Sequence, residues 1–198
     1  MSSLEELKVE CLSCRRCVIG GVDVANGHMS NVFSNMNTGV RVMVVGQNPG
    51  REEVERGEPF VGPSGRFFDE AVESVLGMKR SNFYICNVVR CYTPSNRAPH
   101  VNELENCRCF LDREVELINP VVMIALGAPA FKQLTGMSGI TKHHGRKIFS
   151  PRYSVPVVPL FHPSPYNTNN PKRRKIFYED LKVIGEILQE ADKEAEIG

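Results

Sequence analysis

The segment Val42-Met43-Val44-Val45-Gly46-Gln47-Asn48-Pro49-Gly50 joins a short apolar run to a loop rich in glycine and proline. Three similar apolar runs follow along the chain, at residues 83–89, 121–126 and 155–160. Runs of this length and composition are typical of strands that are buried on both faces of a parallel sheet. The sequence therefore predicts four strands of one parallel sheet.

Segments with helical spacing of apolar residues separate the predicted strands, at residues 67–76 and 104–118. This alternation predicts an α/β fold, a three-layer α/β/α arrangement around a central four-stranded parallel sheet. In such folds, ligands bind at the carboxyl ends of the strands. A last helix from about residue 174 to residue 194 closes the domain, and we expect the chain to fray after about residue 190.

The bulk composition describes an ordinary globular chain. Its 198 residues predict a single domain over residues 1–198, and 41% hydrophobic with 24% charged residues is usual for such a domain. The sequence contains no apolar run of membrane-spanning length and no secretory signal, which predicts a cytoplasmic, monomeric protein. The net charge of +1 gives no information about nucleic-acid binding, because binding depends on local basic surface.

Seven cysteines in an intracellular chain indicate metal ligation rather than disulfides. Cys11, Cys14 and Cys17 form two overlapping C-x-x-C steps, while Cys91 and Cys107 lie far downstream. Four thiolates can converge on one site, and thiolates suit either an iron–sulfur cluster or zinc. The spacing alone leaves the metal open. The two remaining cysteines, Cys86 and Cys109, are expected to take no part.

Two loops that follow predicted strands contain candidate ligand-binding residues. The loop after Val45 continues through a second glycine- and proline-rich stretch, Gly57 to Gly65, where backbone amides can approach a ligand closely. The loop after Leu160 places His162 in a stiff turn bounded by prolines. Because both loops follow strands of the same parallel sheet, we expect them to face one cleft.

Several motifs in this order resemble the uracil-DNA glycosylase superfamily, and most closely its iron–sulfur branch, often called family 4, over roughly residues 11–188. The matching pieces are Cys14-x-x-Cys17, Gly46-Gln47-Asn48-Pro49-Gly50, Pro59-Phe60-Val61-Gly62-Pro63-Ser64-Gly65, Asn87-Val88-Val89-Arg90-Cys91 with Asn96-Arg97, Cys107, Leu126-Gly127 and His162-Pro163-Ser164. The resemblance implies an enzyme of base excision repair that hydrolyses the N-glycosidic bond of a uracil flipped out of DNA. Its DNA can be single- or double-stranded.

The resemblance also implies a [4Fe-4S] cluster on Cys14, Cys17, Cys91 and Cys107, with Cys11 as a competitor for the first position. One departure concerns residues 46–50, because family 4 usually has Gly-Glu-Ala-Pro-Gly where this chain has Gly-Gln-Asn-Pro-Gly. Asparagine at the third position is similar to the mismatch-specific and single-strand-selective branches. A second departure, the proline that follows Ser164, is similar to other branches.

Each matched residue then has an implied role. His162 donates a hydrogen bond to the uracil oxygen that gains charge, and Asn48 orients the attacking water, since an amide is no base at neutral pH. The implied base-binding residues are Gly46, Gln47, Gly50, Phe60, which stacks on the base, and Asn87, which pairs with the uracil edge. The implied DNA-backbone contacts are Ser64 and Ser164, with Pro165 and Tyr166 as a wedge and the basic run 172–175 beside them.

Two other functions are compatible with parts of the sequence. An iron–sulfur electron carrier would need the cysteines, but it would not need Asn48, Phe60, Asn87 and His162 to occur together in the order of the family motifs. A damaged-DNA-binding protein of the same fold with lost or altered catalysis is compatible with the unusual residues 46–50. The sequence also leaves open whether thymine mismatches or deaminated purines are accepted as substrates.

Overall fold

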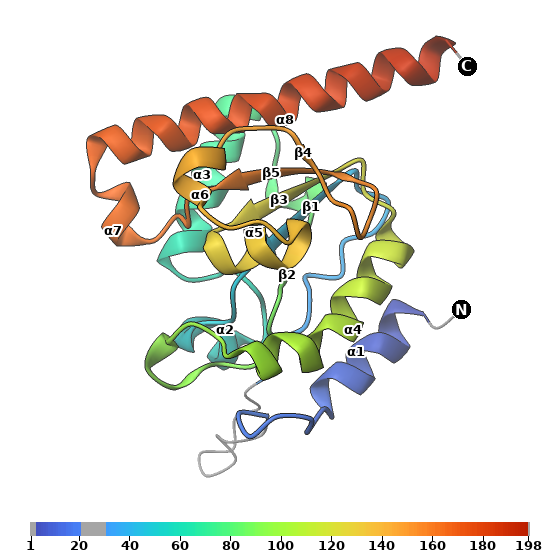
Figure 1. Ribbon diagram of the computed structural model, residues 1–198, viewed down its shortest axis with the longest axis vertical. Helices are drawn as coiled ribbons and strands as arrows, with labels where there is room; N and C mark the ends of the chain where they lie inside the picture. Colours follow the sequence, from blue (N-terminus) through green and yellow to red (C-terminus); the bar gives the residue numbers. More distant parts are fainter. Residues whose placement is uncertain (1–2, 21–30, 198) are drawn as a thin grey trace.

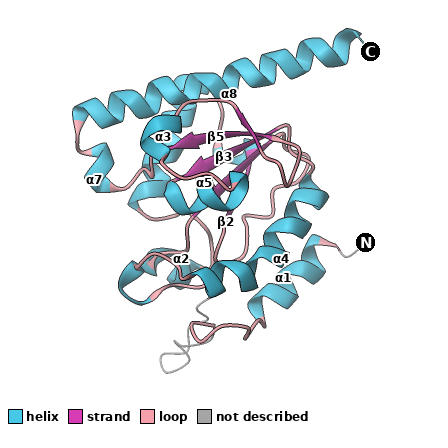
Figure 2. Ribbon diagram, viewed as in Figure 1, coloured by secondary structure: helices cyan, strands magenta, loops and turns pink. Residues whose placement is uncertain are grey.

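The computed structural model describes residues 3–20 and 31–197. Their strands form a five-stranded sheet in the order β2-β1-β3-β5-β4 (Figures 1 and 2). The pairs β1–β2, β1–β3 and β3–β5 are parallel, and β4 runs antiparallel to β5. The bounds of the strands are Val42–Gly46 (β1), Phe83–Asn87 (β2), Val122–Leu126 (β3), Ile148–Phe149 (β4) and Pro156–Leu160 (β5).

The predicted α/β architecture is confirmed, with each of the four predicted strands close to its expected position. The strand count needs correction, because β4 adds an antiparallel fifth strand at the edge. Ile148–Phe149 is only two residues long, too short for any periodicity of apolar residues to reveal it.

The helices differ from the predicted ones mainly at their ends. The last helix begins earlier than predicted and extends through Ile197. No helix in the described ranges combines the length and the apolar composition needed to cross a bilayer. The bounds of the α-helices are Leu4–Leu12 (α1), Arg51–Arg56 (α2), Pro63–Leu76 (α3), Val101–Ile118 (α4), Ala128–Thr135 (α5), Ile140–His143 (α6), Pro165–Thr168 (α7) and Pro171–Ile197 (α8).

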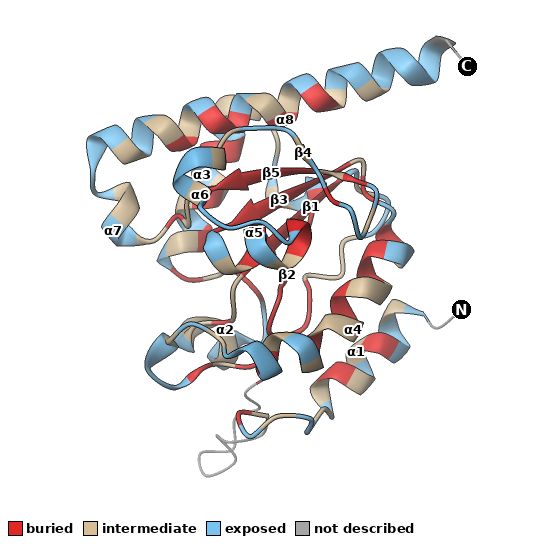
Figure 3. Ribbon diagram, in the orientation of Figure 1, coloured by how far each residue is buried: buried red, intermediate tan, exposed pale blue. Residues whose placement is uncertain are grey.

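Alternate residues of each strand pack on opposite sides of the sheet, which gives three layers. Val42 and Val44 of β1 point toward α3 and α8, while Met43 and Val45 point toward α4 and α5. Strands β1, β2 and β3 are buried along their whole length (Figure 3). α1 packs against the outer side of α4 (Figure 1). Burial of apolar surface on both faces, at about 25 cal/mol per Å², is the main source of stability for such a sheet.

The parallel strands all end at one edge of the sheet. Gly46 at the end of β1 is in register with Asn87 at the end of β2, and Leu126 of β3 is in register with Leu160 of β5. The loops that follow these strands therefore start side by side, which is the arrangement that creates a ligand site.

Candidate active site

A cavity of about 330 Å³, here named the edge cavity, lies at this carboxyl edge of the sheet. Two of its lining residues, Glu53 and Asn96, were given no role from the sequence. The other eight are predicted site residues that the fold brings together: Gln47, Asn48, Gly50, Phe60, Ser64, Asn87, His162 and Ser164.

Two glycines make room for Phe60 at the edge cavity, Gly46 for its ring and Gly65 for its backbone. A Cβ atom on Gly46 would lie 2.4 Å from that ring and 2.5 Å from Oδ1 of Asn87. Phe60 has a left-handed φ of 55°, and a Cβ on Gly65 would lie 1.7 Å from its carbonyl oxygen. Glycine is thus required at both positions, which explains the glycines at the end of β1 and at the start of α3.

Asn87 carries the most unusual polar group of the cavity. The residue is 1% exposed, and within the described residues neither Nδ2 nor Oδ1 of its amide has a hydrogen-bond partner. A buried polar group without a partner costs about 1–3 kcal/mol, and few native groups are left this way. The amide therefore offers one donor and one acceptor to a molecule in the cavity.

Three side-chain amides form a hydrogen-bonded chain along another wall. Gln47 Nε2 donates to Asn48 Oδ1 at 2.8 Å. Asn48 Nδ2 in turn donates to Asn96 Oδ1 at 2.9 Å and to the carbonyl oxygen of Pro49 at 3.0 Å. These contacts hold the Asn48 amide in one orientation at the cavity surface.

Glu53 connects the two glycine-rich loops. Its Oε2 accepts a hydrogen bond from the backbone amide of Gly50 at 3.0 Å, and its Oε1 accepts one from Gly62 at 2.7 Å. Gly50 and Gly62 precede the first residues of α2 and α3, so one carboxylate binds the amino ends of both helices. The loop that carries Asn48 and the loop that carries Phe60 are fixed relative to each other.

His162 faces Phe60 across the cavity, with 6.3 Å between the ring centroids. Burial lowers the pKa of His162 below its ordinary value of 6.5, and the Glu53 carboxylate opposes this shift only in part. The ring is therefore neutral at pH 7 and has one N–H group to donate. Asn167 Nδ2 donates to the His162 carbonyl oxygen at 2.7 Å and thereby fixes the backbone of this turn.

The predicted DNA-contacting residues lie at the rim or outside it. Ser64 and Ser164 are half-buried and line the edge cavity. Pro165 and Tyr166 begin α7 and do not line it, although they directly follow Ser164. Tyr166 is 77% exposed, and the guanidinium carbon of Arg173 lies 4.9 Å from its ring centroid.

The fold gathers the predicted cysteine ligands on the side of the sheet that carries α1 and α4. Buried Cys91 and Cys107 pack with the half-buried Cys17. Cys14 packs against the neighbouring cluster that contains the fully buried Cys11. Among the side chains of the described residues, no three Cys, His, Asp or Glu groups converge closely enough to hold a metal ion.

A buried charge lies next to these cysteines. Arg90 is 1% exposed and forms an ion pair with Glu114 of α4, which also accepts a hydrogen bond from the Tyr84 hydroxyl at 2.8 Å. Nε and Nη1 of Arg90 have no hydrogen-bond partner in the described part of the chain. Burial raises the pKa of the Cys107 thiol, and the nearby Arg90 opposes this shift. Neither Arg90 nor Glu114 was assigned a role from the sequence.

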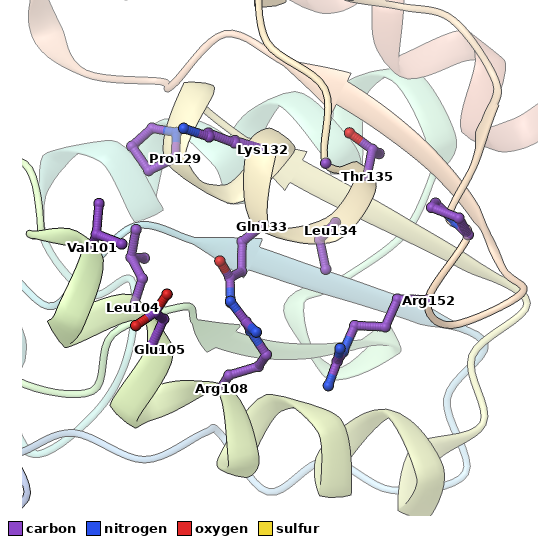
Figure 4. A pocket seen from close by; sticks show the side chains of 12 residues that line it. Val101, Leu104, Glu105, Arg108, Pro129, Lys132, Gln133, Leu134, Thr135 and Arg152 are labelled. Carbon is purple, nitrogen blue, oxygen red and sulfur yellow. The ribbon is translucent and has the colours of Figure 1, made fainter.

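A second hollow of about 340 Å³, here named the α4–α5 groove, contains none of the predicted site residues. Figure 4 shows Leu104 and Arg108 of α4 opposite Lys132 and Gln133 of α5. Arg152 closes one end and is paired with Asp112 through a hydrogen bond of 2.9 Å.

Of the two cavity residues that the sequence analysis missed, only one had a local signal. Glu53 is three residues after Gly50, which is the glutamate position of a helix capping box. Asn96 reaches Asn48 only because Ser95 and Asn96 both have a left-handed backbone. No pattern of residue types predicts that conformation.

The sequence comparisons agree with this geometry. The Uracil DNA glycosylase superfamily model matches residues 33–182. A type-4 uracil-DNA glycosylase from Sulfurisphaera tokodaii is 33% identical over 195 residues, which cover 94% of this chain and 86% of the relative. One from Thermotoga maritima is 39% identical over 154 residues, with coverages of 76% and 79%. By these matches over most of its length, and by the cavity at the ends of its parallel strands, the chain belongs to the uracil-DNA glycosylase superfamily.

Proposed function

We propose that the protein removes uracil from DNA by hydrolysing the bond between the base and its sugar, which leaves an abasic site. The observation that supports this most directly is the Asn87 amide, buried in the edge cavity with both polar atoms unpaired within the described residues. A uracil edge presents a carbonyl oxygen beside an N–H group, so it can pair with both atoms. Relatives that match most of the chain are named for this activity.

The edge cavity suits a base that has left the DNA stack. Flipping a nucleotide out of a duplex costs a few kcal/mol. In this proposal the Phe60 ring stacks on the flipped base, which contributes about 1–3 kcal/mol. Pairing of the uracil edge with Asn87 removes the cost of its unpaired amide, so that stacking and pairing together offset the cost of flipping.

His162 acts on the leaving base. As the glycosidic bond breaks, negative charge grows on a uracil oxygen, and a donor already aimed at that oxygen stabilises the transition state more than the ground state. The neutral His162 ring supplies such a donor without desolvating a charge when the base enters. One preorganised donor of this kind is worth about 2.7–4 kcal/mol in the barrier.

Asn48 acts on the water. An amide does not take up a proton at neutral pH, so Asn48 contributes by holding the water against the sugar carbon as it becomes cationic. Gly46, Gln47 and Gly50 lie at the same end of the strand and let the chain pass close to the base. The Gly50 amide is bound to Glu53, so Gly50 contributes space rather than a hydrogen bond.

The DNA backbone is held outside the cavity. Ser64 and Ser164 at the rim contact phosphates, and Pro165 with Tyr166 fills the gap left by the flipped base. The basic run 172–175 opens α8 directly after this turn and attracts the phosphates. Since its substrate is DNA, we further propose that the protein works in the cell interior. We also propose that it works as a monomer.

We propose that Cys14, Cys17, Cys91 and Cys107 hold a [4Fe-4S] cluster. Four thiolates are the usual ligand set of such a cluster, and Cys17 packs against the same apolar cluster that contains Cys91 and Cys107. Bound there, the cluster would supply a covalent cross-link between the segment after α1 and the face of α4.

The surroundings of the cysteines fit a negatively charged cluster. Arg90 brings a buried positive charge to this place, with Nε and Nη1 unpaired in the described residues, and cluster sulfur atoms accept such hydrogen bonds. Cys11 is fully buried against Leu7 and Phe33, which supports a place in the apolar core rather than in the ligand set.

Base release separates this proposal from a damaged-DNA-binding protein without catalysis. The experiment uses matched oligonucleotides that carry uracil, thymine opposite guanine, or hypoxanthine, with wild-type protein, His162→Ala, Asn48→Ala and Lys132→Ala, the last altering only the α4–α5 groove. We expect uracil release that falls about 10²–10³-fold in His162→Ala. In Asn48→Ala it should fall about 10–100-fold.

Lys132→Ala should release uracil at the wild-type rate. Failure of the wild-type protein to release any base, with its iron bound and DNA binding intact, would support the binding protein instead. Release of thymine or hypoxanthine would widen the substrate range.

A further inference from the structure

Ser95 and Asn96 adopt an unusual backbone conformation beside the edge cavity. Their φ angles are 55° and 54°, both in the left-handed region that residues with a Cβ atom rarely occupy. Consecutive residues of this kind persist only where their surroundings impose the conformation, and they concentrate at functional sites. Neither residue has a part in base removal as described so far.

This turn brings Asn96 to the Asn48 amide. Asn48 Nδ2 lies 2.9 Å from Asn96 Oδ1 and 3.0 Å from the carbonyl oxygen of Pro49. A backbone carbonyl can only accept hydrogen bonds, so the Asn48 atom that faces it must be the nitrogen. Asn48 Oδ1 therefore points the other way, where it also accepts a bond from Gln47 Nε2 at 2.8 Å.

We propose that Asn96 is a positioning residue, which holds the Asn48 amide with its oxygen available to the attacking water. This inference rests on the proposed function. A half-turn of the amide would set Asn48 Oδ1 against two other acceptors, Asn96 Oδ1 and the Pro49 carbonyl. The water needs an acceptor for one of its hydrogens, so that its lone pair faces the sugar. An amide free to turn would present nitrogen part of the time.

The test compares Asn96→Gly with Asn119→Gly. Asn119 is also exposed and left-handed, with φ 48°, but it caps the end of α4 and does not line the edge cavity. Single-turnover uracil release at saturating enzyme should slow about 10–100-fold in Asn96→Gly and stay at the wild-type rate in Asn119→Gly. The Kd for uracil-containing DNA should change less than about threefold in both variants.

The melting temperature separates positioning from stability. Glycine relieves the left-handed strain, so neither variant should melt below wild type. A slow Asn96→Gly variant with a clearly lowered melting temperature would assign Asn96 a structural role and overturn the proposal. A wild-type rate in Asn96→Gly would overturn it as well.

Asn96→Asp provides the rescue. Aspartate keeps an acceptor oxygen at the same place, so its single-turnover rate should lie within about fivefold of wild type even where its added charge weakens DNA binding. A rate as low as that of Asn96→Gly would show that the acceptor is not what matters. If the wild-type protein releases no uracil, the proposed function itself fails, and that result is distinct from a wild-type rate in the variants.

Discussion

The edge cavity and the α4–α5 groove are nearly equal in volume, about 330 and 340 Å³, but their walls differ in kind. The edge cavity is lined mostly by polar side chains, of which Asn48 is held by hydrogen bonds to Gln47 and to the Pro49 carbonyl. The Glu53 carboxylate holds its two loops through their backbone amides. The groove is lined largely by long cationic and aliphatic side chains from two helix surfaces (Figure 4). Volume thus does not distinguish the two hollows, whereas fixed polar groups do.

Each hollow also contains a buried polar group that lacks a partner in the described residues. In the edge cavity it is the whole amide of Asn87, and in the groove it is Nε2 of Gln133. The Asn87 amide lines the same cavity as the Phe60 and His162 rings, while the Gln133 amide has aliphatic side chains and charges around it. Substitutions in the two regions can therefore separate function from stability.

The largest expected effect concerns α4, which carries both a wall of the groove and Cys107. We expect Cys107→Ser to lose most of its iron and to unfold at a much lower temperature, because structural metal sites contribute about 10 kcal/mol or more to folding where this has been measured. Cys109→Ser, two residues away, should keep four iron atoms per chain and the wild-type melting temperature. Iron content, visible absorbance and thermal melting check this.

The same pair of variants can contradict the assignment of ligands. Full iron content in Cys107→Ser would remove Cys107 from the ligand set, and equal losses in both variants would place the cluster elsewhere. A loss confined to Cys107→Ser, with uracil release surviving in any folded fraction, would separate the cluster from the edge cavity.

Asn87→Leu tests whether the unpaired amide of the edge cavity serves function, and Gln133→Leu is the matching change in the α4–α5 groove. Asn87→Leu should lower kcat/KM for uracil release about 10–100-fold, because the uracil edge is then buried against an apolar group. The same change should raise the free energy of unfolding by about 1 kcal/mol, since it removes an unpaired buried amide. Gln133→Leu should raise stability similarly and leave kcat/KM unchanged.

Denaturant unfolding and steady-state kinetics on the same preparations measure both effects. An Asn87→Leu variant that is less stable than wild type would mean that the amide has a partner in the free protein. A Gln133→Leu variant with slow uracil release would extend the functional surface into the groove.

The positions of Asn87 and His162 could be predicted because each lies at or just after the end of an apolar run, and parallel strands bring their carboxyl ends together whatever the details of packing. Phe60 lies far from any apolar run, and only the family resemblance predicted its place. Arg90 is different. It directly precedes Cys91, and only the packing of α4 on the sheet pairs it with Glu114. Such a pairing depends on how a helix packs on the sheet, and no short stretch of sequence predicts that packing.

Asn96 and β4 escaped prediction for a related reason. Asn96 reaches Asn48 through a turn in which two consecutive residues have a left-handed backbone. Strand β4 is a two-residue segment that the chain lays beside β5. Both features arise from the course of a loop over a sheet already formed. Glu53 could have been found, since its place three residues after Gly50 is a recognised capping signal.

The smallest expected effect is the pH dependence of uracil release, which depends on His162. Because burial lowers the pKa of His162 below 6.5, more than half of the rings are neutral at pH 6.5, and the neutral fraction only grows as the pH rises. The single-turnover rate should therefore vary less than about threefold between pH 6.5 and pH 8. If the donor were instead the protonated ring at its ordinary pKa, the rate would fall about tenfold per pH unit above 6.5.

The same lowered pKa makes a prediction for stability that does not depend on catalysis. The unfolded chain takes up a proton at His162 near pH 6.5, whereas the folded chain takes it up only at lower pH, so acidification below 6.5 favours unfolding. Wild-type protein should thus lose more stability than His162→Gln between pH 7 and pH 5, as measured by denaturant unfolding. Equal losses of stability in the two proteins would mean that His162 has the same pKa in the folded and the unfolded chain. Burial in the edge cavity would then not be what keeps this histidine neutral.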